Sequence, residues 1–262
     1  MDSVNKTLYI PLYGKALVSR RGLLLRDPDA ERLWDAAGIP LKGKSASKWL
    51  AYTMGMRSAV FDRWLRENLT EDAVVLHLGC GLDSRCRRVP CDNLWFDVDF
   101  PAVIAERKKH FPESDAYRMI GCDLRENWLE SVPKGGTALV VMEGVSMYLT
   151  ARERLDLLKA LRGHFDRVLL LMDVYTVFGA KASKYKNPIN DVGVTLVHGF
   201  DDPRELETGT GFLFRKAHCL TPEDLIRQLP QREQGFFRLF FAGKAAGKIY
   251  RLYEYHTQAS GA

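Results

Sequence analysis

Short apolar runs alternate with amphipathic stretches through the middle of the chain. The apolar runs predict strands at 73–78, 94–98, 116–121, 137–142 and 167–174, and the stretches between them predict helices near 101–110, 124–131 and 151–165. Alternating strands and helices are typical of a parallel sheet with right-handed crossovers. Pro101 stands where the first of these helices is expected to begin, which suits a residue with a fixed φ.

Before residue 71 the pattern is helical throughout. Asp27 and Pro28 are typical of the N-cap and first position of a helix, and apolar residues recur at helical spacing over 47–69. These features predict a helical N-terminal cap over residues 1–70, followed by an α/β domain over 71–262.

The last third of the chain departs from the alternation. Residues 176–215 are rich in glycine, aspartate, lysine and proline, and we expect them to form a lid insertion over the carboxyl edge of the sheet. Thr221 is a candidate N-cap for a following helix. The stretches 236–242 and 248–256, joined through 243–247, predict a closing antiparallel hairpin. With this hairpin, the sheet is expected to be mostly parallel and seven-stranded.

Composition narrows the class of protein. The chain has 262 residues, 46% hydrophobic and 27% charged, which is ordinary for a globular protein. No apolar stretch is long enough for a membrane span, and residues 1–6 lack the basic-then-apolar pattern of a secretory signal. The five cysteines show neither Cys-x-x-Cys pairs nor a disulfide framework. We therefore expect a cytoplasmic protein with reduced thiols and no membrane partner.

The charge pattern argues against a nucleic-acid partner. The net charge is +5, but the basic residues form scattered clusters at 20–21, 85–88, 107–109 and 181–186. Nucleic-acid binding favours one continuous basic face with interleaved aromatic residues. The clusters are typical of a solvated surface, although an attraction to an anionic small substrate stays open.

A glycine-rich turn follows the first predicted strand. Gly79 and Gly81 come directly after the apolar run 74–78, and Asp99 ends the next run. Glycines let a backbone turn sharply and approach a ligand, and an acid after the second strand can accept hydrogen bonds from ribose hydroxyls. Position 84 is Ser, so the third glycine of the dinucleotide fingerprint is absent. The turn is either a nucleoside cradle or simply a tight turn.

Acids also follow the next two strands. Asp123 and Leu124 come after the third strand, and Glu143 comes after the fourth. Ligands of open α/β sheets bind outside the carboxyl ends of the strands. Any one of these acids could be a helix N-cap, but their recurrence at successive strand ends favours a binding site.

The motifs together resemble a known family. The chain is similar to class I S-adenosylmethionine-dependent methyltransferases, and more narrowly to the leucine carboxyl methyltransferase family and its bacterial branch, the TcmP-like polyketide O-methyltransferases. The matching segments span residues 10 to about 206 and are 10–16, 27–30, 57–65, 78–85, 97–101, 123–124, 143–149 and 199–206. Two features depart from the family: His77 stands where many methyltransferases carry an acid or Asn, and 176–215 matches only in part.

The resemblance implies a role for each matched residue. It implies a Rossmann-like domain over 71–262 that binds S-adenosylmethionine through its methionine, ribose and adenine portions. Arg57 and Lys15 would hold the methionine carboxylate, and Glu143 would face its amino group. The remaining residues implied to bind the cofactor are Gly79 and Gly81 in the turn, Asp99 at the ribose, and Asp123 with Leu124 at the adenine.

The acceptor is less specified than the cofactor. A carboxylate is already ionised and needs no base, whereas an alcohol or phenol gains from one. His198, in the expected lid, is a candidate base or a surface-loop histidine, and Tyr148 is a candidate acceptor-facing residue or a buried aromatic. His77 lies inside a strand and is expected to be a hydrogen-bonded core residue. No spacing typical of a metal site is present, so no metal is expected.

These observations leave three functions open. The first is an O-methyltransferase acting on a carboxylate or hydroxyl oxygen of a small, polyketide-like molecule. The second is a protein carboxyl methyltransferase acting on a chain-terminal carboxylate, and the third is a nucleotide-binding protein of another class on the same scaffold. The sequence does not indicate an oligomeric state.

Overall fold

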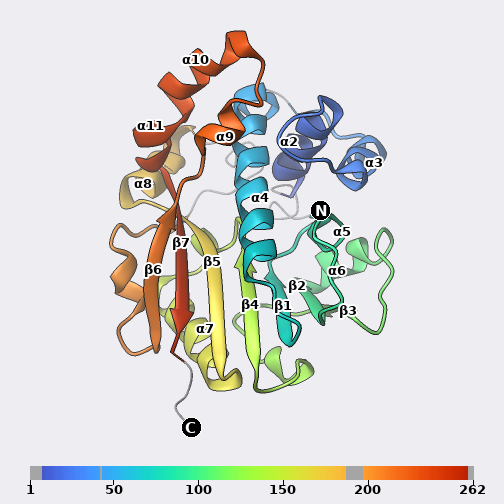
Figure 1. The fold of residues 1–262 in the computed structure, drawn as a ribbon, viewed down its shortest axis with the longest axis vertical. Coiled ribbons are helices and arrows are strands. Elements are labelled where there is room, and N and C mark those ends of the chain that lie inside the picture. Colours follow the sequence, from blue (N-terminus) through green and yellow to red (C-terminus); the bar gives the residue numbers. More distant parts are fainter. Residues whose placement is uncertain (1–7, 42, 187–196, 259–262) are drawn as a thin grey trace.

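The computed structural model describes residues 8–41, 43–186 and 197–258. At its centre is a seven-stranded sheet in the order β3-β2-β1-β4-β5-β7-β6 (Figure 1). The first five strands are mutually parallel, and their bounds are β1 Ala73–Leu78, β2 Trp95–Asp99, β3 Tyr117–Gly121, β4 Thr137–Met142 and β5 Arg167–Tyr175. The parallel sheet and its strand positions confirm the prediction from the apolar runs.

The antiparallel hairpin is present, and its strand predicted at 248–256 is confirmed, but its other strand is formed by different residues from those predicted. β6 Phe212–His218 pairs with β7 Tyr250–Thr257, and β7 also runs antiparallel to β5. The prediction of a strand at 236–242 is wrong, because this segment ends the helix α10 Gln231–Phe241, and α11 Gly243–Gly247 follows it. Phe237 is completely buried while Phe240 is 56% exposed, so the aromatic residues follow the period of an amphipathic helix.

Successive residues of the central strands contribute to opposite faces of the sheet. Leu76 and Leu78 of β1 pack into one apolar cluster, with α7 Ala151–His164, while Ala73 and Val75 pack into another, with α4 Lys48–Asn68. This alternation follows from the period of two in a strand. Both faces are covered, as expected for buried parallel strands.

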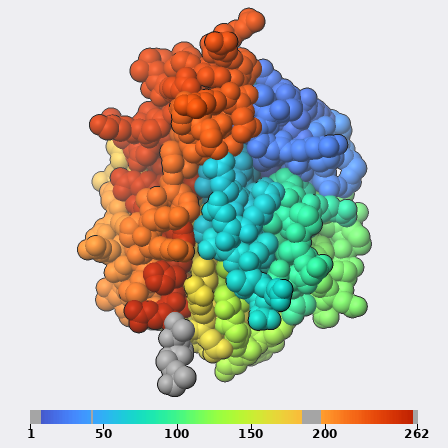
Figure 2. All heavy atoms as spheres, viewed as in Figure 1, coloured from blue at the N-terminus to red at the C-terminus, as the bar shows by residue number. Residues whose placement is uncertain are grey.

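The N-terminal segment forms α2 Tyr9–Arg20, α3 Pro28–Ala37, the short 3-10 helix η1 Gly43–Ala46 and α4. Asp27 caps α3 by accepting a hydrogen bond from the Ala30 amide at 2.9 Å, as predicted from the sequence. Figure 2 shows α4 flanked by the α2–α3 pair on one side and by α9 Glu223–Ile226 and α10 on the other. Figure 1 shows α2, α3 and α10 beyond the end of the sheet where the parallel strands terminate, whereas α4 runs down over one face of the sheet.

Two further local predictions are wrong. The segment 124–131 is mostly turn, with only η2 Leu129–Ser131 helical, because the Asp123 carboxylate accepts a hydrogen bond from the Arg125 amide at 3.0 Å and diverts the backbone. Thr221 does not cap a helix, since Pro222 occupies the N-cap of α9 without a side-chain cap. The Thr221 hydroxyl instead accepts a bond from the Gly243 amide at 3.4 Å.

The remaining elements include those in the segment 176–215, where a lid was expected. α5 Arg85–Arg88 follows the glycine-rich turn, and α6 Pro101–Arg107 starts at Pro101 as predicted. Within the described part of 176–215, α8 Val177–Lys186 and η5 Pro203–Leu206 lie outside the sheet, whereas the start of β6 belongs to it. η3 Ser146–Tyr148 follows β4.

Candidate functional site

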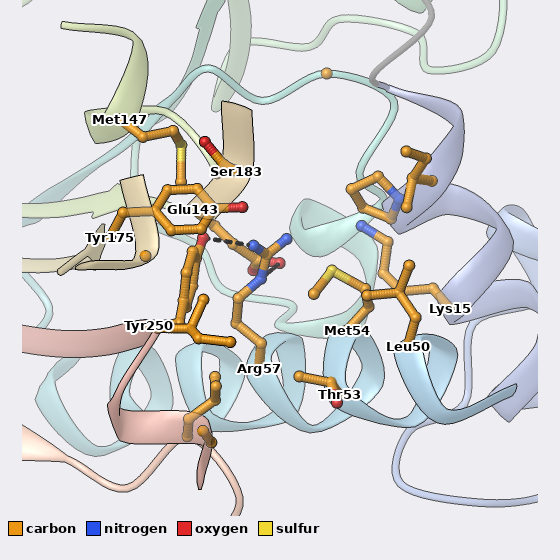
Figure 3. A pocket seen from close by; sticks show the side chains of 18 of the residues that line it. Lys15, Leu50, Thr53, Met54, Arg57, Glu143, Met147, Tyr175, Ser183 and Tyr250 are labelled. Carbon is orange, nitrogen blue, oxygen red and sulfur yellow. Dashed lines mark hydrogen bonds and ion pairs between the residues drawn. The ribbon is translucent and has the colours of Figure 1, made fainter. Parts of the chain in front are cut away.

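A cavity of about 670 Å³ opens at the carboxyl ends of β1 and β4. Its wall comes from α2, α4, the loops after both strands, α8, and the α10–α11 region. Figure 3 shows Arg57 rising from α4 at its centre, with Lys15 on one side and Tyr250 and Tyr175 on the other. Besides these charged residues the lining is largely apolar, and its part from the C-terminal third of the chain is formed by Leu220, Phe240, Phe241, Ala245, Ala246 and Ile249.

The turn after β1 needs glycine. Gly79 has a φ of +66°, and a Cβ there would lie 2.1 Å from Cγ2 of Val145. Gly81 also has a positive φ, of +52°, and its amide donates to the Asp99 carboxylate at 2.7 Å. Both glycines line the cavity, which places bare backbone against any bound ligand.

Replacement of Gly79 tests this close approach. We expect Gly79→Ala to lower the free energy of unfolding by about 1–3 kcal/mol, because it combines a disfavoured φ with a steric clash. Gly136→Ala is the matched control, because Gly136 has a φ of +67° with no atom within 4 Å of a Cβ. Thermal denaturation of both variants separates the two causes, and an equal loss in each would show that the clash with Val145 is harmless.

Arg57 is buried, and within the described residues its hydrogen bonds come from Nε and Nη1. Its Nε donates to Glu143 at 3.0 Å, and its Nη1 donates to Asp173 at 3.0 Å and to the Tyr250 hydroxyl at 2.8 Å. Among the described residues, none accepts a hydrogen bond from its Nη2. The arginine lines the cavity, so these two remaining donors are available to a ligand.

Glu143 is a carboxylate held by two guanidinium groups. Besides Arg57, it accepts bonds from Arg85 Nη2 and from the Ser58 hydroxyl, the latter at 2.9 Å. Burial by itself would raise the pKa of Glu143, but Arg57 and Arg85 lower it to about 2. Glu143 is therefore ionised at neutral pH and can face a cationic group.

Beneath the cavity the charged network continues. Lys15 pairs with Asp83 at 3.1 Å, and Arg88 pairs with Asp83 and with Asp27 at 2.7 Å each. Burial opposes ionisation of Asp83, but Arg85, Arg88 and Lys15 hold its pKa well below the usual range. The predicted site residue Lys15 thus lines the cavity as part of a buried ion pair.

The hydrogen bonds of His77 fix its tautomer. Its Nε2 lies 3.1 Å from Arg85 Nη1, and its Nδ1 lies 3.2 Å from Asp97 Oδ1. Arginine only donates, so Nε2 must accept and Nδ1 must carry the proton. His77 is therefore a neutral, hydrogen-bonded core residue, as predicted, although its side chain also borders the cavity.

Not every predicted cofactor residue lines the cavity. Asp99 lies beside it: its carboxylate accepts from the Gly81 and Phe100 amides, and burial raises its pKa. Asp123 and Leu124 lie outside the lining. The Asp123 carboxylate accepts from Arg125 Nε at 2.9 Å, and Leu124 packs against the core. The adenine-binding role expected for these two residues stays a prediction.

The two candidate catalytic residues differ in their relation to the cavity. Tyr148, on η3, is 38% exposed and lines the cavity. His198 does not belong to the lining, and its amide donates to the Met147 carbonyl at 2.8 Å. Their catalytic roles stay predictions, but only Tyr148 is placed to meet an acceptor directly.

Two site residues were missed by the sequence analysis. Asp173 lies near the carboxyl end of β5, where the rule that identified the other strand-end acids would have found it. Tyr250 begins β7, and its ring packs edge-on against Tyr175 with centroids 5.0 Å apart. No sequence signal pointed to Tyr250, because it lies in the strand predicted at 248–256 but the pairing of that strand with β5 could not be predicted from the sequence.

Neither a metal-binding cluster nor a membrane-crossing helix is found within the described residues. They contain no group of three or more His, Cys, Asp or Glu side chains arranged to hold a metal ion. In the same part of the chain, none of the helices is long and apolar enough to cross a membrane.

The chain is similar to known methyltransferases. The family described as Leucine carboxyl methyltransferase matches residues 6–162. The chain is 35% identical over 219 residues to the tetracenomycin polyketide synthesis O-methyltransferase TcmP of Streptomyces glaucescens, with 79% of each chain covered. It is 30% identical over 186 residues to the S-adenosyl-L-methionine-dependent methyltransferase dpfgK of Gibberella zeae, covering 63% of this chain and 62% of that protein.

Solved structures share the architecture. Magnesium protoporphyrin IX methyltransferase from Synechocystis with bound SAH superposes with a TM-score of 0.53 at 13% identity, covering 87% of this chain and 93% of that one. The same enzyme with bound SAM gives a TM-score of 0.52 at 12% identity, covering 88% and 92%. At such low identity the likeness shows the class I methyltransferase fold alone.

Proposed function

Because the chain belongs to the leucine carboxyl methyltransferase family, we propose that it methylates a carboxylate oxygen of a small, largely apolar molecule. It is an S-adenosylmethionine-dependent methyltransferase. The proposal adds the atom that receives the methyl group and the kind of molecule that carries it.

The residues of the cavity fit the cofactor. The turn at Gly79 places bare backbone at the cavity, and Nη2 of Arg57 is open to donate a charge-assisted hydrogen bond to a carboxylate. Glu143 stays ionised beside them and suits an ammonium group. When bound, the cofactor supplies a methyl group on a sulfonium. Arg57 and Lys15 would hold its methionine carboxylate, Glu143 its amino group, and Asp99 its ribose.

One observation carries the choice of a carboxylate: none of the described lining residues is placed to act as a general base. The His77 Nε2 already accepts from Arg85, and cations hold Asp83 and Glu143 ionised with lowered pKa values. The other titratable groups of the lining are lysines, an arginine, a cysteine and phenols, which keep their protons at neutral pH. An acceptor that arrives ionised needs no base.

The apolar and aromatic residues of the lining support a small-molecule acceptor. Among them are Phe240, Phe241 and Ile249 in and after the α10–α11 region, together with Tyr148 and Tyr175. Burial of apolar surface there would align the acceptor with the methyl group, and alignment alone can lower a barrier by about 7–11 kcal/mol. TcmP, to which the chain is similar, is named for polyketide synthesis, and we propose a polyketide-like acceptor here too.

The test is the alkali stability of the product. Labelled S-adenosylmethionine would be incubated with the protein and either 2-naphthoic acid or 2-naphthol, which share a ring system. We expect transfer to the acid only, giving a methyl ester that mild alkali converts to volatile labelled methanol. The rate should stay flat with pH above the carboxyl group's own pKa, near 4.

Other outcomes would contradict the proposal. An alkali-stable methyl ether formed from 2-naphthol, at a rate rising with pH, would indicate a hydroxyl acceptor and an unrecognised base. Transfer to a peptide with a free C-terminus, but to neither small molecule, would favour a protein carboxyl methyltransferase.

A further inference from the structure

The charged cluster under the cavity contains one more carboxylate than cations. Among the described residues, its side chains are all at most 8% exposed. The four cations are Lys15, Arg57, Arg85 and Arg88, and the five carboxylates are Asp27, Asp62, Asp83, Glu143 and Asp173. His77 adds no charge, because its hydrogen bonds require the neutral tautomer.

The excess falls on carboxylates that share a single cation. Asp62, Asp83 and Glu143 each contact at least two cations, whereas Asp27 contacts Arg88 alone and Asp173 contacts Arg57 alone. Asp173 shares Arg57 with Glu143 and, among the described residues, otherwise accepts from neutral donors, the Gly144 amide and the Tyr250 hydroxyl. Of the two, Asp173 is the one whose cation lines the cavity. Its side chain is completely buried.

The two forms of the cofactor differ by one charge at the sulfur. S-adenosylmethionine carries a carboxylate, an ammonium and a sulfonium and is a monocation, whereas S-adenosylhomocysteine has a neutral sulfur and no net charge. A buried negative charge attracts the first and not the second, and the low dielectric of the interior strengthens the attraction. We propose that Asp173 supplies the negative charge by which this protein binds its cationic methyl donor more tightly than the neutral product.

Proton binding should report this interaction. The groups facing Asp173 are Arg57 from α4, Glu143 after β4, and Tyr250 from β7, with Tyr175 on its own strand. Burial raises the pKa of Asp173 to about 6, although Arg57 and the Tyr250 hydroxyl act against this. A cation bound nearby favours the ionised form and lowers that pKa again. At pH 6, the methyl donor should therefore displace a proton that the product leaves in place.

The experiment is calorimetric titration of the intact protein at pH 6, in two buffers of different ionisation enthalpy. The ligands are S-adenosylmethionine and S-adenosylhomocysteine. We expect the methyl donor to release roughly 0.2–0.5 more protons than the product, since Asp173 starts about half protonated. Asp99 also has a raised pKa, but the ribose it is proposed to bind is common to both ligands, so the difference removes its contribution.

Two variants isolate the charge of Asp173. Asp173→Asn keeps the shape but not the charge, so the difference in proton release should vanish and the affinity ratio of donor to product should fall on the order of tenfold. Asp224→Asn makes the same chemical change at a carboxylate that is 55% exposed, so it should retain both differences. Loss of both in Asp224→Asn, or their persistence in Asp173→Asn, would overturn the proposal.

If circular dichroism shows that Asp173→Asn does not fold, the native protein alone tests the proposal. Equal proton release by the native protein for the two ligands at pH 6 overturns the proposal, and a larger release for the methyl donor supports it. The inference rests on cofactor binding in this cavity and not on the acceptor. A failure of the naphthoic acid assay would leave it intact, whereas native protein that binds neither ligand would contradict both.

Discussion

Arg57→Met is expected to reduce the affinity for S-adenosylmethionine by at least roughly a hundredfold. Methionine keeps much of the length of the side chain but removes every donor. A charge-assisted hydrogen bond from Nη2 is worth about 1.5–3 kcal/mol, and loss of the buried positive charge beside the carboxylate adds to it, which together corresponds to that factor. Arg57→Lys should lose less, because it keeps the charge while losing the planar fork.

The variant must be separated from an effect on folding. Arg57→Met leaves Glu143 with Arg85 and Ser58 as partners but leaves Asp173 with neutral donors, so circular dichroism must show that the variant is folded before its affinity is measured. Arg63→Met is the matched control, because Arg63 lies on the same helix, α4, and pairs with exposed Asp224. Calorimetry should show native affinity for Arg63→Met. Unchanged affinity in folded Arg57→Met would remove the proposed role of Arg57.

Arg57 shows how much of the candidate site could be predicted from the sequence. The strand-end residues Gly79 and Glu143 were found because parallel strands bring their carboxyl ends to one edge. Arg57 comes from a helix outside the α/β alternation, and only the family resemblance connected it with the site. In the structure α4 packs across the sheet and brings Arg57 within 3.0 Å of Glu143.

What the sequence did not predict was pairing between distant segments. Tyr250 reaches Arg57 because β7 is inserted beside β5, and periodicity cannot reveal which strands become neighbours. The segment containing Phe237 was assigned to a strand because a short aromatic-rich apolar run suits either a strand or a buried helix. Similarly, the sequence indicated Asp27 as a helix cap, but it gave no sign that the fold also pairs Asp27 with Arg88.

Arg85→Met is expected to destabilise the protein by about 3–5 kcal/mol, because removal of one partner leaves buried charges uncompensated. Arg85 is completely buried and pairs with Asp62 at 2.7 Å, with Asp83 at 3.3 Å, and with Glu143. It also donates to His77. In a chain of this size such a loss corresponds to a fall in Tm of roughly 10 °C or more.

The neighbouring Arg87 supplies the control for this prediction. It lies on the same short helix, α5, but its side chain is 50% exposed and its contact with Asp29 is 3.6 Å. An exposed pair of this kind contributes about 0–1 kcal/mol, so Arg87→Met should unfold within about 3 °C of the native protein. The comparison keeps the chemical change constant and varies only burial. Similar Tm values for both variants would mean that the carboxylates around Arg85 are protonated or reached by water. The count of buried charges on which the proposed role of Asp173 rests would then fail as well.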